Sequence, residues 1–124
     1  MARLRALVVD DVVDMAQTIA NELQAAGFDT SVAASGASAL DAFAREPADV
    51  VVTDLRMPEL GGPEFVALLR AEAPTLPVVY VSGYAEHQGI HVLRPNEAFL
   101  EKPFTGDALL GALARVVDVS RRGT

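Results

Sequence analysis

The chain has no cysteine, which excludes a disulfide framework, a thiol nucleophile and a zinc–thiolate centre. It also lacks a long apolar run, because its longest apolar stretches fall far short of the roughly 20 residues that span a bilayer. Asp10 and Asp11 interrupt the first apolar run too early for a signal peptide. We therefore expect a cytoplasmic protein, or a domain of a larger one, with no membrane insertion.

Basic residues are also scarce. The 124 residues include 10 Lys and Arg against 17 Asp and Glu, for a formal net charge of −7. This charge argues against direct binding to nucleic acid through its phosphates, and the basic pair at 121–122 is too short to form a patch. The sequence contains no internal repeat, low-complexity segment or linker, and 51% of its residues are hydrophobic. Length and composition favour one domain over residues 1–124 with a sizeable core.

Strand and helix signals alternate five times along the chain. Short apolar runs at 7–9, 50–52, 78–81 and 99–100 are typical of buried parallel strands, and 30–34 is a weaker strand signal. Between them we expect helices over 12–26, from Ser35, from Pro63 and from Thr105. This βαβαβαβαβα order predicts a three-layer α/β sandwich with right-handed crossovers. The fourth helix has the weakest signal, because the residues available for it, 83–97, include two glycines and a proline.

Local signals indicate where the helices end and which faces they bury. Gly27 is placed to cap the end of the first helix, and Ser35 and Thr105 to cap the starts of the second and last. The expected core faces are Ala16, Ile19, Ala20 and Leu23 in the first helix; Ala39, Leu40 and Phe43 in the second; Phe65, Leu68 and Leu69 in the third; and Leu109, Leu113 and Val116 in the last.

Four of the apolar runs end in polar residues, which are uncommon inside a buried strand. These runs lead into Asp10 and Asp11, Asp54, Ser82 and Lys102. In an open parallel sheet, ligands bind beyond the carboxyl ends of the strands, so we expect these side chains at one sheet edge. Three carboxylates would repel one another unless a cation lay among them, and such oxygen ligands suit Mg²⁺.

Phosphoryl transfer is a chemistry that this set can support. A carboxylate such as Asp54 can form an acyl phosphate, while Lys102 and the Ser82 hydroxyl can each bind a phosphoryl oxygen. Each residue also has an ordinary interpretation: acids in a solvated turn, a solvated lysine and a turn serine. His87 and His91, spaced i and i+4, could mimic a metal-binding pair, but without a third ligand nearby they are better interpreted as exposed polar residues.

The order of these motifs resembles the receiver domain of two-component response regulators. The matching segments are Val8-Val9-Asp10-Asp11, Val52-Thr53-Asp54-Leu55-Arg56-Met57-Pro58, Val81-Ser82-Gly83-Tyr84-Ala85 and Lys102-Pro103-Phe104. The resemblance covers about residues 4–118 and implies a flavodoxin-like (βα)5 fold, with a five-stranded parallel sheet in the order 2-1-3-4-5. The stretches 81–85 and 99–104 look most like receivers attached to hybrid histidine kinases, or free-standing relatives.

The resemblance implies a role for each acidic or basic strand-end residue. Asp54 corresponds to the phosphoacceptor, and Asp11 to the direct metal ligand, with Asp10 acting through water. The backbone carbonyl of Arg56 would be a further ligand of Mg²⁺. Lys102 corresponds to the lysine that binds the phosphoryl group.

The same resemblance implies a switch and a control on phosphoryl lifetime. Ser82 and Phe99 occupy the hydroxyl and aromatic positions of the family's switch. Arg56 and Tyr84 stand two residues after the phosphoacceptor and two after the switch hydroxyl, where side chains flank the attacking water. Both are bulky and neither is a carboxylate or carboxamide, so we expect a long-lived phosphoryl group. The stretch 82–102 is a residue or two shorter than usual in the family, so the resemblance does not fix the length or position of the fourth helix.

We therefore expect a phosphorylation-dependent signalling domain rather than an enzyme with a separate substrate. A histidine kinase or histidine phosphotransfer protein would donate the phosphoryl group. The domain, a monomer or weak dimer, would promote its own phosphorylation and dephosphorylation and act on a downstream target that the sequence does not name. Two alternatives stay open: a pseudo-receiver that binds partners without phosphorylation, and a metal-dependent phosphatase, which would normally carry an acid where Arg56 stands.

Overall fold

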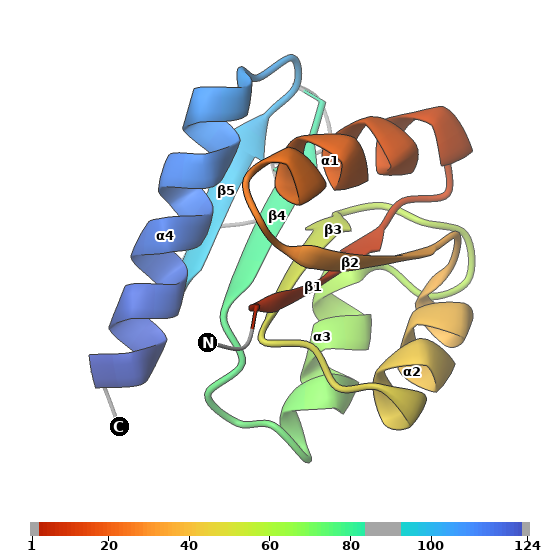
Figure 1. Ribbon diagram of the computed structural model, residues 1–124. Helices are drawn as coiled ribbons and strands as arrows, with labels where there is room; N and C mark the ends of the chain where they lie inside the picture. Colours follow the sequence, from red (N-terminus) through yellow and green to blue (C-terminus); the bar gives the residue numbers. More distant parts are fainter. Residues whose placement is uncertain (1–2, 84–92, 123–124) are drawn as a thin grey trace.

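Five parallel strands form one sheet in the computed structural model, which describes residues 3–83 and 93–122 (Figure 1). The strands are β1 Arg5–Val9, β2 Asp29–Ala33, β3 Val50–Asp54, β4 Val78–Ser82 and β5 Glu97–Glu101. Their order across the sheet is β2-β1-β3-β4-β5, and all neighbouring pairs are parallel. The predicted flavodoxin-like strand order is therefore confirmed.

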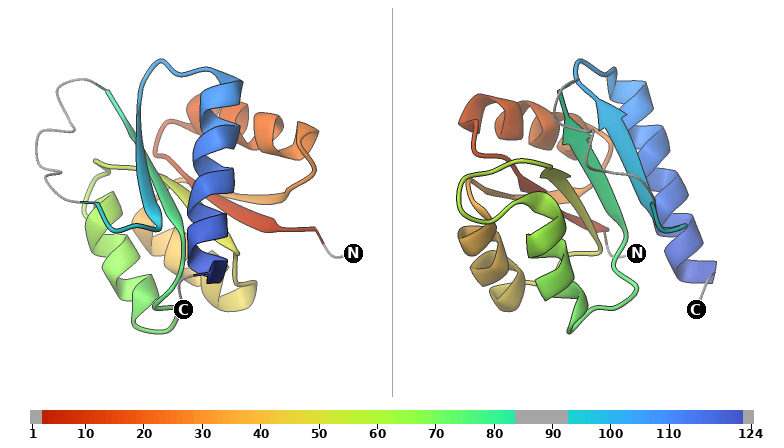
Figure 2. Two further views of the ribbon diagram at one scale, coloured as in Figure 1. Left: turned by 90° about the vertical axis from the view of Figure 1, so that its left-hand side faces the viewer. Right: turned by 180° about the vertical axis from the view of Figure 1, so that it is seen from behind.

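Helices cover both faces of this sheet. They are α1 Val13–Ala25, α2 Gly36–Arg45, α3 Gly62–Arg70 and α4 Gly106–Arg122. Figure 2 shows α1 and α4 on one side of the sheet and α2 and α3 on the other, and each pair has its own hydrophobic cluster against the strands. The predicted three-layer sandwich is confirmed.

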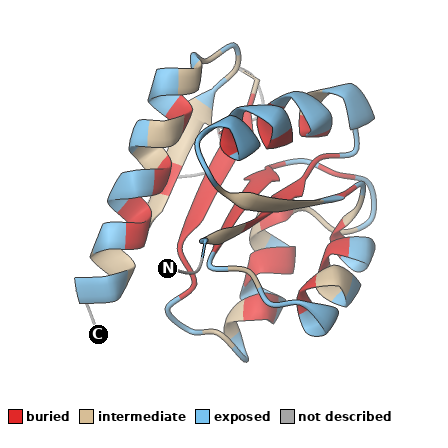
Figure 3. Ribbon diagram, viewed as in Figure 1, coloured by how far each residue is buried: buried red, intermediate tan, exposed pale blue. Residues whose placement is uncertain are grey.

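The two neighbouring strands β3 and β4 are buried at every residue, because helices pack on both of their faces (Figure 3). Successive side chains point to opposite sides, so Val50 and Val52 pack with α1 and α4, whereas Val51 packs with α2 and α3. Strand β2 lies at the sheet edge and is only partly buried. Its weak sequence signal follows from that position, since an edge strand needs fewer apolar residues.

Three predicted helix-end residues act as caps. Ser35 Oγ accepts a hydrogen bond from the Ser38 N–H at 3.0 Å, and Thr105 Oγ1 accepts one from the Ala108 N–H at 3.0 Å. Gly27 follows α1 with a φ of 101°, a left-handed conformation that glycine adopts without strain. These helices therefore begin or end within a residue or two of the predicted positions.

The predicted core faces are confirmed for α1 and α4, whose predicted residues are all buried. In α3 one prediction was wrong. Phe65 and Leu69 are buried as expected, but Leu68 is 53% exposed and Val66 is buried in its place. Positions 65, 66 and 69 share one helix face, and position 68 lies about 100° around the helix from the centre of that face. In α2, Leu40 packs on the core but is only partly buried.

Most of the segment expected to hold a fourth helix, 83–97, lies outside the described residues, as do His87 and His91. In its described part, residues 93–96 are not helical, and Glu97 begins β5. The prediction of a short or irregular element there is therefore tested only at its end.

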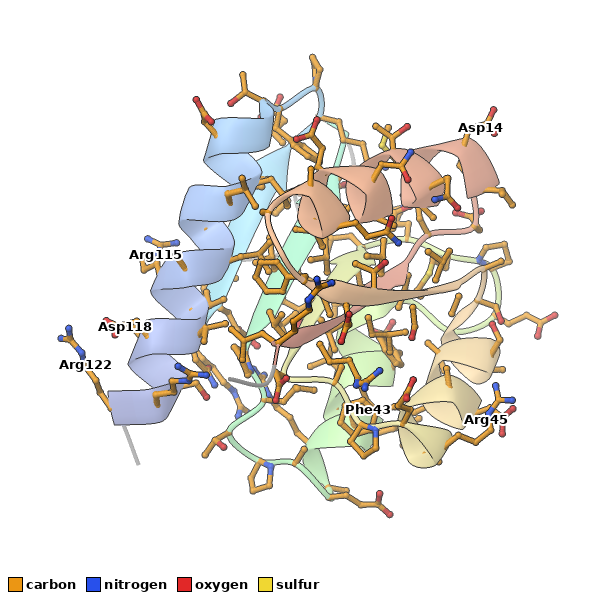
Figure 4. The ribbon with its side chains drawn as sticks, in the orientation of Figure 1. Asp14, Phe43, Arg45, Arg115, Asp118 and Arg122 are labelled. Atoms are coloured by element: carbon orange, nitrogen blue, oxygen red, sulfur yellow. The ribbon has the colours of Figure 1, made fainter. Side chains whose placement is uncertain are left out.

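The outer face of α4 is charged. Figure 4 shows Arg115, Asp118 and Arg122 projecting away from the sheet, and Asp118 and Arg122 form an ion pair of 3.0 Å. The opposite face buries Leu109 and Leu113. This helix is amphipathic, and none of the described helices is long and apolar enough to cross a membrane.

Candidate functional site

Strand register brings the predicted strand-end residues to one edge of the sheet. The β1–β3 pairing ends one residue before Asp10 and Asp54, so these two acids leave neighbouring strands side by side. Just past β5, the Lys102 N–H donates to the Ser82 carbonyl of β4 at 2.7 Å. These residues follow four strands that are consecutive neighbours in the sheet, β1, β3, β4 and β5. Their terminal polar residues therefore lie at the same edge, as predicted.

Three carboxylates meet at this edge. One oxygen atom from each of Asp10, Asp11 and Asp54 lies within 4.8 Å of the other two. Asp10 is fully buried and Asp54 is 5% exposed, whereas Asp11 faces solvent. Like charges this close repel one another, and more strongly where water is excluded. The cluster therefore favours a cation.

Lys102 contributes a positive charge to the cluster and is the only lysine in the sequence. Its Nζ lies 3.3 Å from Asp10 Oδ2 and 3.8 Å from Asp54 Oδ1. With all three acids ionised, three negative charges against one positive leave a net charge of −2. A divalent cation would balance this charge, and the carboxylates offer the oxygen ligands that hard cations prefer.

Backbone N–H groups hold two of the carboxylates in place. The Val12 N–H donates to Asp10 Oδ1, and the Leu55 N–H donates to Asp54 Oδ1, each at 2.9 Å. These donors lie in the turns that leave β1 and β3, so the backbone itself orients the acids. Sequence analysis missed both donors, because almost any residue type supplies an N–H group.

Gly62 is a second requirement of the site that sequence analysis missed. A Cβ atom at this position would lie 2.4 Å from the Asp54 carbonyl oxygen, so a larger residue could not approach the strand this closely. The Gly62 N–H also donates to the Leu55 carbonyl at 2.9 Å. The start of α3 is thereby packed against the end of β3. The signal in the sequence is the pair Gly61-Gly62, directly before the helix expected from Pro63.

The two predicted switch residues lie on β4 and β5. Ser82 is fully buried, and its Oγ donates to the Gly83 carbonyl at 3.2 Å. Phe99 is partly buried and packs on the cluster that faces α2 and α3. Arg56, in the loop after β3, is exposed, and Tyr84 lies outside the described residues. The roles of all four residues stay predictions.

The edge can bind a cation and an anion next to each other. The carboxylates offer a cation site, and the Lys102 ammonium beside Asp54 can pair with an anionic oxygen. Asp54 is itself a potential nucleophile, and it lies between the cation site and the ammonium that would pair with the anion. Such a combination suits a group that carries several negative oxygens and can be transferred to a carboxylate.

Comparisons with known proteins agree with this geometry. The sequence pattern of the response regulator receiver domain matches residues 6–114. A putative NtrX-like response regulator of Rickettsia conorii is 30% identical over 125 residues, which cover 98% of this chain and 26% of that protein. The C4-dicarboxylate transport transcriptional regulatory protein DctD of Pseudomonas aeruginosa is 30% identical over 122 residues, which cover 97% of this chain and 26% of that protein.

A solved structure is also similar. The response regulator receiver domain protein of Clostridium thermocellum matches with a TM-score of 0.87 and 25% identity, covering 98% of this chain and 99% of that one. This chain spans 26% of the length of the two curated relatives. The similarity to them therefore concerns one part of each longer protein.

Proposed function

The chain belongs to the response regulator receiver domain family of two-component systems, and from that premise we propose that Asp54 accepts a phosphoryl group as a signal. The observation that carries this proposal is the setting of the Asp54 carboxylate, which lies with Asp10 and Asp11 and 3.8 Å from the Lys102 ammonium. A transferred phosphoryl group needs positioning and charge neutralisation, and this setting offers both.

We propose Mg²⁺ as the cation of the site. Asp11 and Asp54 would bind it directly, Asp10 through water, and Arg56 through its backbone carbonyl. The support is the set of oxygen donors and the net charge of −2. When bound, the ion neutralises charge on the phosphoryl oxygens and helps to orient the incoming group.

The phosphoryl donor would be the phosphohistidine of a histidine kinase or of a histidine phosphotransfer protein. The Asp54 carboxylate attacks phosphorus, the bond from phosphorus to the histidine nitrogen breaks, and the nitrogen keeps the electron pair. Lys102 pairs with a phosphoryl oxygen. Water later hydrolyses the acyl phosphate, which restores the Asp54 carboxylate and releases inorganic phosphate, so the domain promotes its own phosphorylation and its own dephosphorylation.

The new charge would act as a switch through Ser82 and Phe99. The Ser82 hydroxyl exchanges its hydrogen bond to the Gly83 carbonyl for one to a phosphoryl oxygen, and Phe99 repacks beside it. The population then shifts between two packings, which changes the surface around β5, α4 and the segment expected to hold the fourth helix, most of which lies outside the described residues. Four further features stay predictions: a receiver core over about residues 4–118, a monomeric or weakly dimeric state, a cytoplasmic location and membership of the hybrid-kinase subclass.

Two alternatives have less support. A pseudo-receiver would be expected to lack part of the acid set or the lysine, whereas here the acids and Lys102 meet at one edge. A metal-dependent phosphatase would use a second acid two residues after the nucleophile, and Arg56 stands there with an exposed side chain.

Mass spectrometry after incubation with phosphoramidate and Mg²⁺ tests the proposal. The wild-type protein should gain one phosphoryl group, and Asp54→Asn should gain none. Asp41→Asn, which changes an exposed acid on α2, is the matched control and should gain mass as the wild type does. No gain in the wild type would contradict the proposal, and an undiminished gain in Asp54→Asn would identify a different acceptor.

A further inference from the structure

Tyr80 occupies a position next to both proposed switch residues. On β4 it precedes Ser82 by two residues, so the two side chains point to the same face of the sheet. Across the sheet, Tyr80 is the register partner of Phe99 on β5. Tyr80 and Phe99 also belong to the same hydrophobic cluster, on the side of α2 and α3. One large ring therefore lies beside both the hydroxyl and the aromatic position of the switch.

The surroundings of Tyr80 are closely fixed. Arg70 of α3 forms an ion pair with Glu97 of β5, and the two side chains are each 8% exposed. The Arg70 guanidinium also donates to the Leu76 carbonyl at 2.7 Å, and the Arg94 N–H donates to Glu97 Oε1 at 2.9 Å. These contacts tie the end of α3 to the start of β5, on the face where the Tyr80 ring lies.

Tyr80 itself is only 4% exposed. Burial raises the pKa of its hydroxyl to about 12, and the carboxylate of Glu97 adds to this rise. The residue is therefore a neutral, buried ring over the physiological pH range. Little in the sequence indicates a role for Tyr80 in the switch, because a tyrosine in an apolar strand is usually a core residue.

We propose that Tyr80 is a positioning residue of the switch: its ring fills the space on one side of Phe99, so Phe99 can repack only into the volume that Ser82 leaves when it moves toward the phosphoryl group. This inference rests on the proposed function. Side chains in a protein interior are closely packed, so Phe99 can move inward only if a neighbour yields volume. The ordered ion pair beside Tyr80 limits how far that ring can yield. Movement of Ser82 then becomes the event that releases Phe99.

A smaller residue at position 80 should uncouple Phe99 from phosphorylation. In Tyr80→Leu, Phe99 gains space without any movement of Ser82, so the ratio of repacked to resting Phe99 should rise by about tenfold in the unphosphorylated protein. Tyr80→Phe keeps the ring and removes only the hydroxyl, so it should behave like the wild type. Val79→Ala removes volume from the opposite face of β4 and is the matched control.

Fluorine NMR of protein labelled with fluorophenylalanine can follow Phe99 directly. The sequence has five phenylalanines, and Phe99→Leu identifies the resonance of interest. In the wild type, Tyr80→Phe and Val79→Ala, this resonance should shift only after phosphoramidate and Mg²⁺ are added. In Tyr80→Leu it should lie part of the way toward the shifted position before the donor is added, because the repacked population has risen about tenfold. Tyr80→Met serves as a second variant if the leucine protein does not fold.

The same samples separate this inference from the proposed function. If the wild type gains a phosphoryl group by mass but the Tyr80→Leu resonance keeps its resting position without donor, Tyr80 does not position Phe99. A shift of equal size in Val79→Ala would also overturn the proposal, because loss of core volume alone would then explain it. No mass gain in the wild type would instead refute phosphorylation itself.

Discussion

Magnesium binding should stabilise the fold, because it relieves the repulsion among three carboxylates. Two unit charges separated by the 4.8 Å limit of this cluster repel by about 3.5 kcal/mol at an effective dielectric constant of about 20, and by about 0.9 kcal/mol in bulk water. Asp10 and Asp54 are buried while Asp11 is exposed, so the repulsion energy of each pair of carboxylates lies between these two values. The Lys102 ammonium offsets only part of this repulsion, because its single charge leaves the cluster at −2.

The size of the effect follows from ligand linkage. At a hundredfold excess of Mg²⁺ over its dissociation constant, the free energy of unfolding should rise by about 2.7 kcal/mol. For a chain of 124 residues, the entropy of unfolding near the midpoint is about 0.26 kcal/mol per degree, which converts this gain into a rise in Tm of about 10 °C. Differential scanning calorimetry at pH 7 measures the shift, with KCl at equal ionic strength as the reference.

Two variants show whether the shift comes from this site. Asp11→Asn removes a ligand and a negative charge, so it should raise Tm without metal and lose most of the Mg²⁺-dependent rise. Asp118→Asn changes an exposed acid on α4 and should keep the full rise. The reasoning is refuted if the wild type melts at the same temperature with Mg²⁺ and with KCl, or if Asp11→Asn keeps the whole shift.

Three further predictions concern the phosphoryl group and the buried tyrosine. Lys102→Ala should fold and bind Mg²⁺, but it should be phosphorylated more slowly by phosphoramidate, because the transferred group loses its cationic partner; an unchanged rate by mass spectrometry would remove Lys102 from the mechanism. The double variant Arg56→Asn with Tyr84→Ala should lose its phosphoryl group about tenfold faster, or about 1.4 kcal/mol of barrier, once the donor is removed. If the decay is unchanged, these side chains do not control access of water. Finally, the raised pKa of Tyr80, about 12, means that the native state keeps a proton that the unfolded chain loses above about pH 10. The contribution of Tyr80 to stability should therefore be complete below pH 10 and be lost as the pH rises to 12. Urea unfolding of the wild type and Tyr80→Phe across that range should show the extra loss in the wild type alone.

The local features of the fold were predictable from the sequence, because each depends on residues close together in the chain. Period-3.6 apolar patterns gave the buried faces of α1 and α4, and Ser35 and Thr105 marked the starts of two helices. Leu68 shows where this reasoning fails: a helix position at the margin of an apolar face is buried or exposed according to what packs there, which the helix sequence does not contain.

The sequence was enough to predict which residues form the candidate site, because polar residues end several apolar runs and the carboxyl ends of parallel strands lie at one edge of the sheet. Asp10, Asp54, Ser82 and Lys102 lie at the same edge for this reason. The strand order and the role of each residue came from the resemblance to receiver domains, since apolar periodicity does not fix which strands are neighbours.

Only the tertiary structure decided how the site is arranged. It places Lys102 nearer to Asp10 than to Asp54, buries Asp10 while leaving Asp11 in solvent, and brings Gly62 against the Asp54 carbonyl. It also joins α3 to β5 through a buried ion pair, next to a tyrosine that one strand's sequence could not distinguish from ordinary core. Distances across the sheet depend on register and packing between segments far apart in the chain, as in the 92-residue separation of the Asp10–Lys102 pair. Residue types and local periodicity determine which groups reach the sheet edge, and the packing of distant elements determines their separation, burial and charge balance.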